Sequence, residues 1–303
     1  MNRVLLISPD LFSDHFKEFL AGRFSEIYYF TEESTFDSFT DINVVVCRMQ
    51  VCLPASFLKR NPVEMVFSVT TGVDHLDEAT KLEIPIVHLD PDDVRLNAIY
   101  SSSEHALFLT MALVRESYHQ RQNSIVGTDL ANLKVGILGG GRIGSNLYAW
   151  LSAICLEPIS VLDLDPKKCR SLTSRGALPD LDVLILAVKS NDANKGLVNR
   201  RSIVTLGSPK YLVNIARGEI VNEFDIQCLL EKGYLSGYAT DVLRAENSDD
   251  EADQKFRRWI IESCNGASNM NIVYSPHVGG LTRSSVATAD MIIADKIEKR
   301  YGS

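Results

Sequence analysis

The stretch Leu133-Lys-Val-Gly-Ile-Leu-Gly139-Gly-Gly141-Arg142-Ile143-Gly144 decides the fold that the sequence predicts. A short apolar run leads directly into a glycine triplet, and a helix-forming segment follows. In such a turn Gly139 permits the tight bend, Gly141 lets the backbone approach a ligand, and Gly144 lets the helix pack closely on the strand. The start of a helix carries partial positive charge, so its amides favour an anionic group. The stretch therefore predicts a turn that binds the pyrophosphate of a dinucleotide.

The same alternation of short apolar runs and helical segments continues to the end of the chain. Strands are predicted at Lys134–Leu138, Ser160–Leu164, Val183–Val188, Tyr211–Ile215, Tyr238–Asp241 and Ile272–Tyr274. Strands separated by helices in this way are typical of a doubly wound parallel sheet. With the glycine triplet, this sheet predicts a Rossmann domain.

The N-terminal part of the chain predicts a second α/β sheet. Its expected strands are Val4–Ile7, Val44–Cys47, Met65–Val69 and Pro85–His88. A long helix is expected from Ser101 towards Tyr118, and a final helix from about Thr282 to Lys299. Since single cores stop growing at about 250 to 300 residues, a chain of 303 residues predicts two such domains.

Composition excludes several other classes of protein. The net charge is −8, and no run of Lys and Arg exceeds two residues, which speaks against nucleic acid as a partner. The six cysteines form no CxxC pair or zinc-ligand pattern, so we expect reduced thiols and no metal site. No apolar stretch approaches the length of a membrane span or a signal peptide. We therefore expect a cytoplasmic protein.

The strand after the glycine turn should end in an acid that binds the adenosine ribose. The sequence Val161-Leu-Asp163-Leu-Asp165-Pro166 offers two, and Asp165 is expected, with Asp163 the alternative. The cations that follow closely could instead receive a 2′-phosphate; they are Lys167, Lys168 and Arg170. NAD is the expected cofactor, and NADP stays open.

Three chemically active side chains follow three later strands. Arg217 follows the strand at Tyr211–Ile215, Glu246 follows the next strand, and His277 follows the last. Because the carboxyl ends of parallel strands share one edge of the sheet, these residues should lie near the nicotinamide end of the cofactor. Hydride transfer to a 2-oxo acid needs a proton donor and a cation for the carboxylate, which His277 and Arg217 provide. Glu246 can fix the tautomer of the imidazole and favour its protonated form.

At these residues the sequence resembles the D-isomer-specific 2-hydroxyacid dehydrogenase family. The resemblance spans most of the chain and includes Thr71-Gly-Val-Asp74, Ser-Glu104-His105, Gly136-Ile-Leu-Gly-Gly-Gly-Arg-Ile-Gly144, Asn214-Ile-Ala-Arg217-Gly218, Asp241-Val242, Glu246 and Ser275-Pro-His-Val-Gly-Gly280 with Thr282. The sequence departs from the family pattern at Lys189 and Asn247, where prolines are usual. These departures leave the acid substrate open.

The resemblance implies a role for each of these segments. It makes His277 the acid/base, Glu246 its partner and Arg217 the ligand of the substrate carboxylate. The other expected substrate contacts are Arg48 and the main-chain amides of Thr71, Gly72 and Val73. The expected cofactor contacts are Gly139, Gly141, Arg142, Ile143, Gly144, Asp165, Ala216, Asp241 and Gly279.

The resemblance also implies how the chain is divided. Residues 1–98 and 282–303 would form a discontinuous, flavodoxin-like substrate domain, and residues 99–281 the NAD-binding Rossmann domain. A homodimer through the cofactor domain, using the helix from about Ser102, would be usual. The expected activity is hydride transfer between NAD(H) and a small D-2-hydroxy or 2-oxo acid. An NAD(H)-sensing, corepressor-like regulator with little turnover is the alternative.

Overall fold

The computed structural model describes the chain except for residues 1, 50, 117–125, 175, 247, 249 and 303. The positions Tyr118 and Asn247, which entered the sequence predictions, lie outside the described residues. The chain forms two compact units. Unit 1 consists of residues 1–99 and 280–303, and unit 2 consists of residues 100–279.

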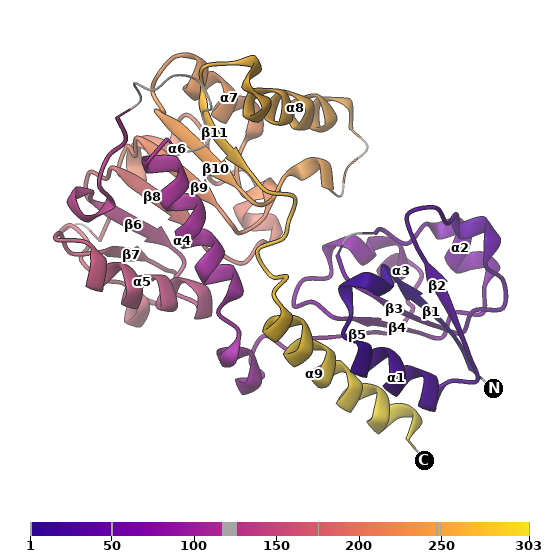
Figure 1. Cartoon of the computed structure of the whole chain (residues 1–303). Coiled ribbons are helices and arrows are strands. Elements are labelled where there is room, and N and C mark those ends of the chain that lie inside the picture. Colours follow the sequence, from indigo (N-terminus) through magenta and orange to yellow (C-terminus); the bar gives the residue numbers. More distant parts are fainter. Residues whose placement is uncertain are drawn as a thin grey trace. The chain divides into compact units, whose positions relative to one another are not determined.

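Unit 1 is built on a five-stranded parallel sheet with the strand order β2-β1-β3-β4-β5 (Figure 1). The strands are β1 (Arg3–Ile7), β2 (Glu26–Phe30), β3 (Val44–Cys47), β4 (Met65–Ser68) and β5 (Ile86–His88). Residues of β1 alternate between two cores. Val4 and Leu6 pack with α1 (Asp14–Arg23) and α9 (Arg283–Tyr301), whereas Leu5 and Ile7 pack with α2 (Ala55–Arg60) and α3 (Asp77–Lys81). Helices thus cover both faces, as a parallel sheet requires.

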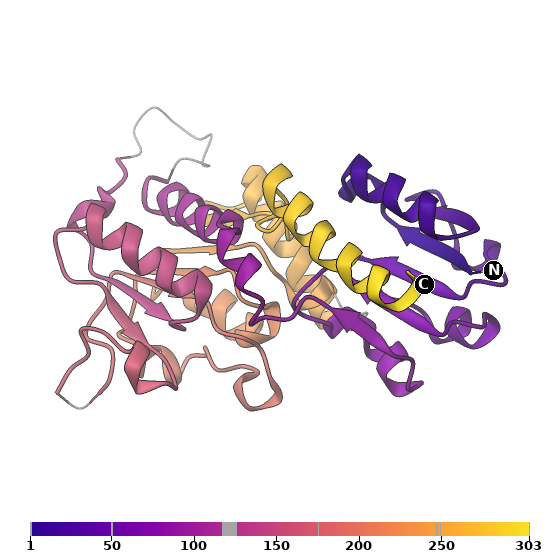
Figure 2. The same ribbon diagram turned by 90° about the horizontal axis from the view of Figure 1, so that it is seen from below.

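Unit 2 is built on a six-stranded parallel sheet with the order β11-β10-β9-β8-β6-β7. The strands are β6 (Val135–Leu138), β7 (Ser160–Leu162), β8 (Val183–Leu186), β9 (Tyr211–Asn214), β10 (Gly237–Thr240) and β11 (Asn271–Tyr274). One face packs against α4 (Ser101–Val114) and α5 (Arg142–Ile154), which lie side by side in Figures 1 and 2. The other face packs against α6 (Ser202–Thr205), α7 (Glu223–Glu231) and α8 (Glu251–Glu262).

The strand order of unit 2 reverses at β6. The chain runs from β6 to β7 on one side and then crosses to β8 on the other side. In open parallel sheets, ligands bind at the carboxyl ends of the strands where the order reverses. The glycine turn follows β6 directly, so it lies at this point.

The predicted fold class, two doubly wound parallel α/β sheets, is confirmed, with two differences in detail. The sequence analysis missed β2, which lies at the edge of its sheet and has only one buried residue, Phe30, instead of a continuous apolar run. The second expected strand of unit 2 was too long, since β7 ends at Leu162 and Leu164 is exposed. Among the described residues, no helix combines the length and apolar character of a membrane span.

Candidate active site

The glycine turn after β6 has the geometry that a pyrophosphate needs. Gly139 adopts a positive φ of 104°, which side chains disfavour. A Cβ at Gly144 would collide with the carbonyl oxygen of Gly139, so only glycine allows this approach of helix to turn. Gly141, the N-cap of α5, instead faces open space, since a Cβ at this position would have no heavy atom within 4 Å. Arg142 and Ile143 form the first turn of α5, half-buried beside this opening.

The acid that contacts the glycine turn is Asp163. Its Oδ2 accepts a hydrogen bond from the Gly140 amide at 2.7 Å, and its Oδ1 accepts one from the Asp165 amide at 2.8 Å. Partial burial acts to raise the pKa of Asp163, but these amide hydrogen bonds prevail and lower it below its usual value. The carboxylate of Asp165 instead accepts from the Lys167 amide at 3.0 Å and caps a short 3-10 turn. The preferred candidate from the sequence, Asp165, therefore caps a separate turn, and the alternative, Asp163, bonds the glycine turn.

His277 and Glu246 form a hydrogen-bonded pair at the carboxyl edge of the same sheet. The distance from His277 Nδ1 to Glu246 Oε2 is 2.6 Å, and about a fifth of each side chain is exposed, 21% and 22%. The other oxygen of Glu246 accepts from the Leu243 amide at 2.7 Å, which fixes the carboxylate. His277 adopts a positive φ of 54°. A non-glycine residue in this region is strained, and such strain is concentrated at functional sites.

Asp241 holds the loop that carries His277. Its Oδ1 accepts from Ser275 Oγ at 2.6 Å and from the Val278 amide at 3.0 Å, and its Oδ2 accepts from the Gly279 amide at 2.9 Å. His105 on α4 adds a hydrogen bond between its Nε2 and Ser275 Oγ at 2.7 Å. Burial acts to raise the pKa of Asp241, yet the hydrogen bonds lower it overall. The sequence analysis assigned Asp241 to the cofactor; in the structure its carboxylate positions the histidine loop.

Arg217 lies in the turn that follows β9, and β9 is the neighbour of β10, the strand that leads to Glu246. Asn214, which is fully buried, shapes this turn: its Oδ1 accepts from the Ala216 amide at 3.1 Å and its Nδ2 donates to the Arg217 carbonyl at 2.9 Å. A Cβ at Gly218 would collide with the backbone of Leu243 and Arg244. The turns of Arg217 and Glu246 therefore pack directly on one another.

A buried acid that the sequence did not reveal supports the turn of Glu246. Glu223, the first residue of α7, accepts a hydrogen bond from the Arg244 amide through Oε1 at 2.8 Å. Its Oε2 is buried without a hydrogen-bond partner among the described residues. Burial raises the pKa of Glu223 to about 7. An acid is common in the first turn of a helix, because its negative charge interacts favourably with the helix dipole. The local sequence therefore gave no sign that this residue is buried.

The substrate contacts expected in unit 1 differ in their surroundings. Thr71, Gly72 and Val73 form a half-buried loop after β4, and within the described part of the chain their amides donate no hydrogen bond. Arg48 is instead buried at the end of β3, where its guanidinium bonds Asp290 of α9 at 2.7 Å and the Val69 carbonyl at 3.3 Å. The structure thus gives Arg48 a packing role within unit 1.

Comparisons with known proteins place this site in a family. A family model described as "D-isomer specific 2-hydroxyacid dehydrogenase, NAD binding domain" matches residues 100–279. The chain belongs to the D-isomer specific 2-hydroxyacid dehydrogenase family. The resemblance seen in the sequence is thereby confirmed.

The individual relatives are distant. D-3-phosphoglycerate dehydrogenase of Bacillus subtilis is 22% identical over 97% of this chain and 56% of its own length. Hydroxyphenylpyruvate reductase of Plectranthus scutellarioides is 26% identical over 96% of this chain and 94% of its own length. This chain thus spans little more than half of the first relative.

Solved structures show the same fold. D-lactate dehydrogenase from Aquifex aeolicus, complexed with NAD and lactic acid, has a TM-score of 0.73 at 19% identity, covering 98% of this chain and 95% of that one. An NADPH-dependent glyoxylate/hydroxypyruvate reductase from Sinorhizobium meliloti has a TM-score of 0.72 at 20% identity, covering 100% and 94%. Nothing in these comparisons supports the alternative of a regulator without turnover.

Proposed function

We propose that this chain is a 2-hydroxyacid dehydrogenase that transfers a hydride between NAD(H) and a small D-2-hydroxy or 2-oxo acid. The observation that carries the proposal is the pair of His277 and Glu246, hydrogen-bonded at 2.6 Å at the sheet edge that also carries the glycine turn. The names of its relatives, dehydrogenases and reductases, agree with this reaction class.

In this proposal His277 moves the proton that accompanies the hydride. Because Glu246 accepts from Nδ1, the imidazolium is stabilised and its second nitrogen, Nε2, carries the proton to be donated. His277 donates this proton to the carbonyl oxygen during reduction and takes it from the hydroxyl during oxidation. The strained backbone at His277, held by Asp241, fixes the ring before substrate binds.

Arg217 binds the substrate carboxylate in the same proposal. Its planar guanidinium can donate two parallel hydrogen bonds, which orient a carboxylate better than a lysine would. The turn held by Asn214 and packed through Gly218 fixes the backbone from which this side chain extends. In unit 1, the unbonded amides of Thr71–Val73 are the proposed further donors to a carboxylate. Arg48 is left out of the proposed site, since its guanidinium already bonds Asp290.

The residues of the glycine turn fit a nicotinamide dinucleotide, which supplies or accepts the hydride when bound. The open space at Gly141 would admit the pyrophosphate at the start of α5. Asp163, rather than Asp165, is the proposed acceptor for the ribose hydroxyls, because it is the acid that lies against the turn. Ala216 and Gly279 are also proposed cofactor contacts, because they lie on the turns that carry Arg217 and His277.

The choice between NADH and NADPH tests this assignment. We expect NADH to bind more tightly, since a 2′-phosphate would meet the Asp163 carboxylate, and Asp163→Ser should reduce the difference by about tenfold. Fluorescence titration of the wild type and the variant, with Asp165→Ser as the matched control, measures both affinities. Stronger binding of NADPH by the wild type would instead assign control of the site to Lys167, Lys168 and Arg170.

The reaction class is tested with a panel of 2-oxo acids. Glyoxylate, hydroxypyruvate, phosphohydroxypyruvate and pyruvate are each assayed with NADH and with NADPH, and the configuration of the product is determined. At least one acid should be reduced to its D-2-hydroxy acid. Binding of NADH without turnover of any acid would favour the regulator.

Dimerisation through α4 is a further proposal. Two apolar side chains on this helix, Phe108 and Met111, are spaced three residues apart and are 48% and 41% exposed. Residues at this spacing lie on one face of a helix, so they could form an isologous contact. Sedimentation velocity would show a dimer if they do.

A further inference from the structure

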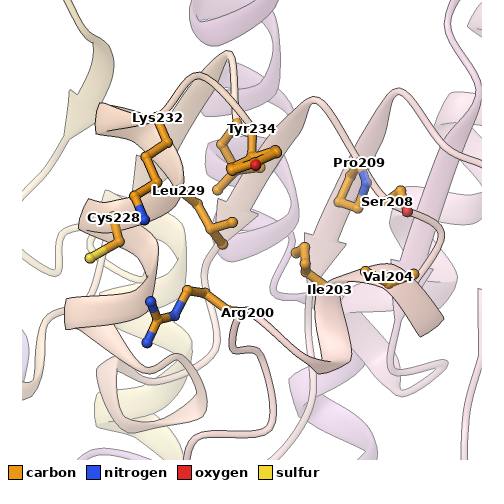
Figure 3. A pocket seen from close by; sticks show the side chains of 10 residues that line it. Arg200, Ile203, Val204, Ser208, Pro209, Cys228, Leu229, Lys232 and Tyr234 are labelled. Carbon is orange, nitrogen blue, oxygen red and sulfur yellow. The ribbon is translucent and has the colours of Figure 1, made fainter.

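A cavity lies in unit 2 at the sheet edge opposite to the candidate active site. Its volume is about 270 Å³, and it is formed by α6, the C-terminal half of α7, and the segments that lead into β9 and β10 (Figure 3). These segments precede their strands, whereas Arg217, Glu246 and His277 follow theirs. The cavity is therefore separated from the candidate active site by the length of the strands.

The larger part of this cavity is apolar. Its walls include Ile203, Val204, Pro209, Leu229, Tyr234 and Leu235. Val204 is 65% exposed and Tyr234 is 73% exposed, so a ligand that covers them would remove apolar surface from water, worth about 25 cal/mol per Å². A cavity of about 150 Å³ is enough to bind benzene. The volume here accommodates an aromatic ring or a branched aliphatic chain together with a short polar arm.

One side of the cavity is cationic. In Figure 3 the charged ends of Arg200 and Lys232 lie on the side of Cys228, away from Val204 and Pro209. Arg200 is paired with Asp225 at 2.6 Å, which neutralises its charge. Lys232 is exposed and forms no ion pair within the part of the chain that the structure describes. The cavity thus combines an apolar end with one uncompensated positive charge.

We propose that this cavity is an effector site for a small carboxylate with an aromatic or branched aliphatic body. The apolar body would lie between Val204, Leu229 and Tyr234, and the carboxylate would bind the ammonium of Lys232. A single positive charge favours a monoanion over a phosphate dianion or a neutral molecule. Binding of this ligand does not depend on the proposed reaction, whereas its effector role rests on the proposed function.

Helix α7 connects the cavity to the candidate active site. Its C-terminal half contributes Cys228 and Leu229 to the cavity wall, and its first residue, Glu223, holds the Arg244 amide in the turn of Glu246. A ligand that shifts or stiffens this helix would act on the turn through that hydrogen bond. The effect should appear in kcat, because neither end of α7 belongs to the glycine turn.

Binding is tested by protection of Cys228, a half-buried thiol in the cavity wall. The probe is 3-phenylpropanoate, and the matched control ligand is its neutral amide, 3-phenylpropanamide. Alkylation by N-ethylmaleimide is followed by peptide mass spectrometry, with Cys52, an exposed thiol of unit 1, as the internal control. At about ten times the Kd, the acid should slow alkylation of Cys228 about tenfold and leave Cys52 unchanged. Isothermal titration calorimetry gives the Kd independently.

Two variants separate the contribution of the Lys232 charge to binding from that of the apolar wall. Lys232→Gln removes the positive charge and should weaken binding of the acid about tenfold, as loss of a charge-assisted hydrogen bond predicts. Lys59→Gln on α2 of unit 1 is the control and should bind as the wild type does. Three outcomes would overturn the proposed site. The wild type could bind the acid and the amide with equal affinity, Lys232→Gln could bind the acid as tightly as the wild type, or the acid could fail to bind.

The effector role has its own test. With a 2-oxo acid that the wild type reduces, saturating 3-phenylpropanoate should change kcat and leave the Kd of NADH unchanged, and Lys232→Gln should lose this effect at the same concentration. Binding without any change in kcat would overturn the regulatory part of the proposal. Failure of the chain to reduce any acid would contradict the proposed function but would leave the binding result intact.

Discussion

Two hydrogen-bonded pairs, each of a carboxylate with a basic side chain, differ in their surroundings. Arg48 and Asp290 meet at 2.7 Å inside unit 1, with only 7% and 2% of their side chains exposed. His277 and Glu246 meet at 2.6 Å in unit 2, with 21% and 22% exposed. Both pairs join segments that are far apart in the sequence, yet one is closed off from solvent and the other is accessible.

The other contacts of each pair explain the difference. Asp290 also accepts from the amide and the hydroxyl of Ser13, both at 2.8 Å, so its two oxygens tie α9 to β3 and to the start of α1. His277 has a strained backbone and one ring nitrogen engaged by Glu246. Breaking a buried ion pair leaves an uncompensated charge inside the protein, so such a pair maintains a fold, whereas an accessible pair that contains a titratable ring is suited to proton transfer.

The largest expected effect belongs to the accessible pair. His277→Ala should lower kcat by about 100 to 10,000-fold, the usual contribution of a positioned proton donor. The affinity for NADH should stay nearly unchanged, because the ring lies on a different turn from the glycine loop. Steady-state kinetics and fluorescence titration measure the two quantities, and His15→Ala, exposed on α1, is the matched control. Wild-type turnover by His277→Ala would show that another group moves the proton.

The buried pair should instead affect stability. Asp290→Asn leaves Arg48 as an uncompensated buried charge, so the free energy of unfolding should fall by about 3 to 5 kcal/mol. Urea denaturation of the variant and of Asp295→Asn, an exposed acid on the same helix, measures the difference. A loss of less than about 1 kcal/mol would mean that the pair behaves like one on the surface.

A second substitution separates packing from substrate binding at this position. In the double variant Arg48→Met and Asp290→Leu, no charge remains buried, so much of the lost stability should return. If Arg48 contacts substrate, as the family resemblance implied, this folded double variant would show a raised KM. An unchanged KM would leave Arg48 with the packing role alone.

The sequence could predict one of these pairs and not the other, for a physical reason. Interior parallel strands are continuous apolar runs, and residues that follow them lie at one sheet edge, which is how Arg217, Glu246 and His277 could be grouped. Asp290 lies on a helix 242 positions from its partner Arg48. No local pattern indicates that a helical acid will be buried against a strand end.

Two other features could not be predicted from the sequence. One is the choice of acid at the end of β7, and the other is the edge strand β2. The choice between Asp163 and Asp165 depends on which carboxylate the glycine turn contacts, and the Gly140 amide, which follows a different strand, bonds Asp163. The edge strand β2, Glu26–Phe30, was missed because an edge strand with exposed side chains need not be apolar. Tertiary contacts decide both features.

A third acid extends the comparison, since Glu223 is buried like Asp290 but bonds no cation among the described residues. Burial raises its pKa from 4.5 to about 7, so the folded chain holds this proton more tightly than the unfolded chain does. Stability from this group is therefore present below pH 4.5 and is lost as the pH rises to about 7. Glu223→Gln cannot ionise and still offers an oxygen to the Arg244 amide. It should be more stable than the wild type above pH 7, by at most on the order of 3 kcal/mol.

Urea denaturation at about pH 4.5 and about pH 8 measures this difference, and the advantage of the variant should disappear at the lower pH. The exposed acid Glu251→Gln on α8 is the matched control. A variant that is equally stabilised at both pH values would show that the buried charge is not the cause.

The smallest expected effect tests how the accessible pair works. Glu246→Gln keeps an oxygen that can accept from His277 Nδ1 and from the Leu243 amide, so the fold should remain intact. It removes the negative charge beside the imidazole, so kcat for 2-oxo acid reduction should fall by about tenfold. Initial rates of the wild type and the variant measure this ratio, and urea denaturation shows whether the variant is as stable as the wild type. An unchanged kcat would mean that the hydrogen bond to His277 Nδ1, without the charge of the carboxylate, is enough for the proton transfer.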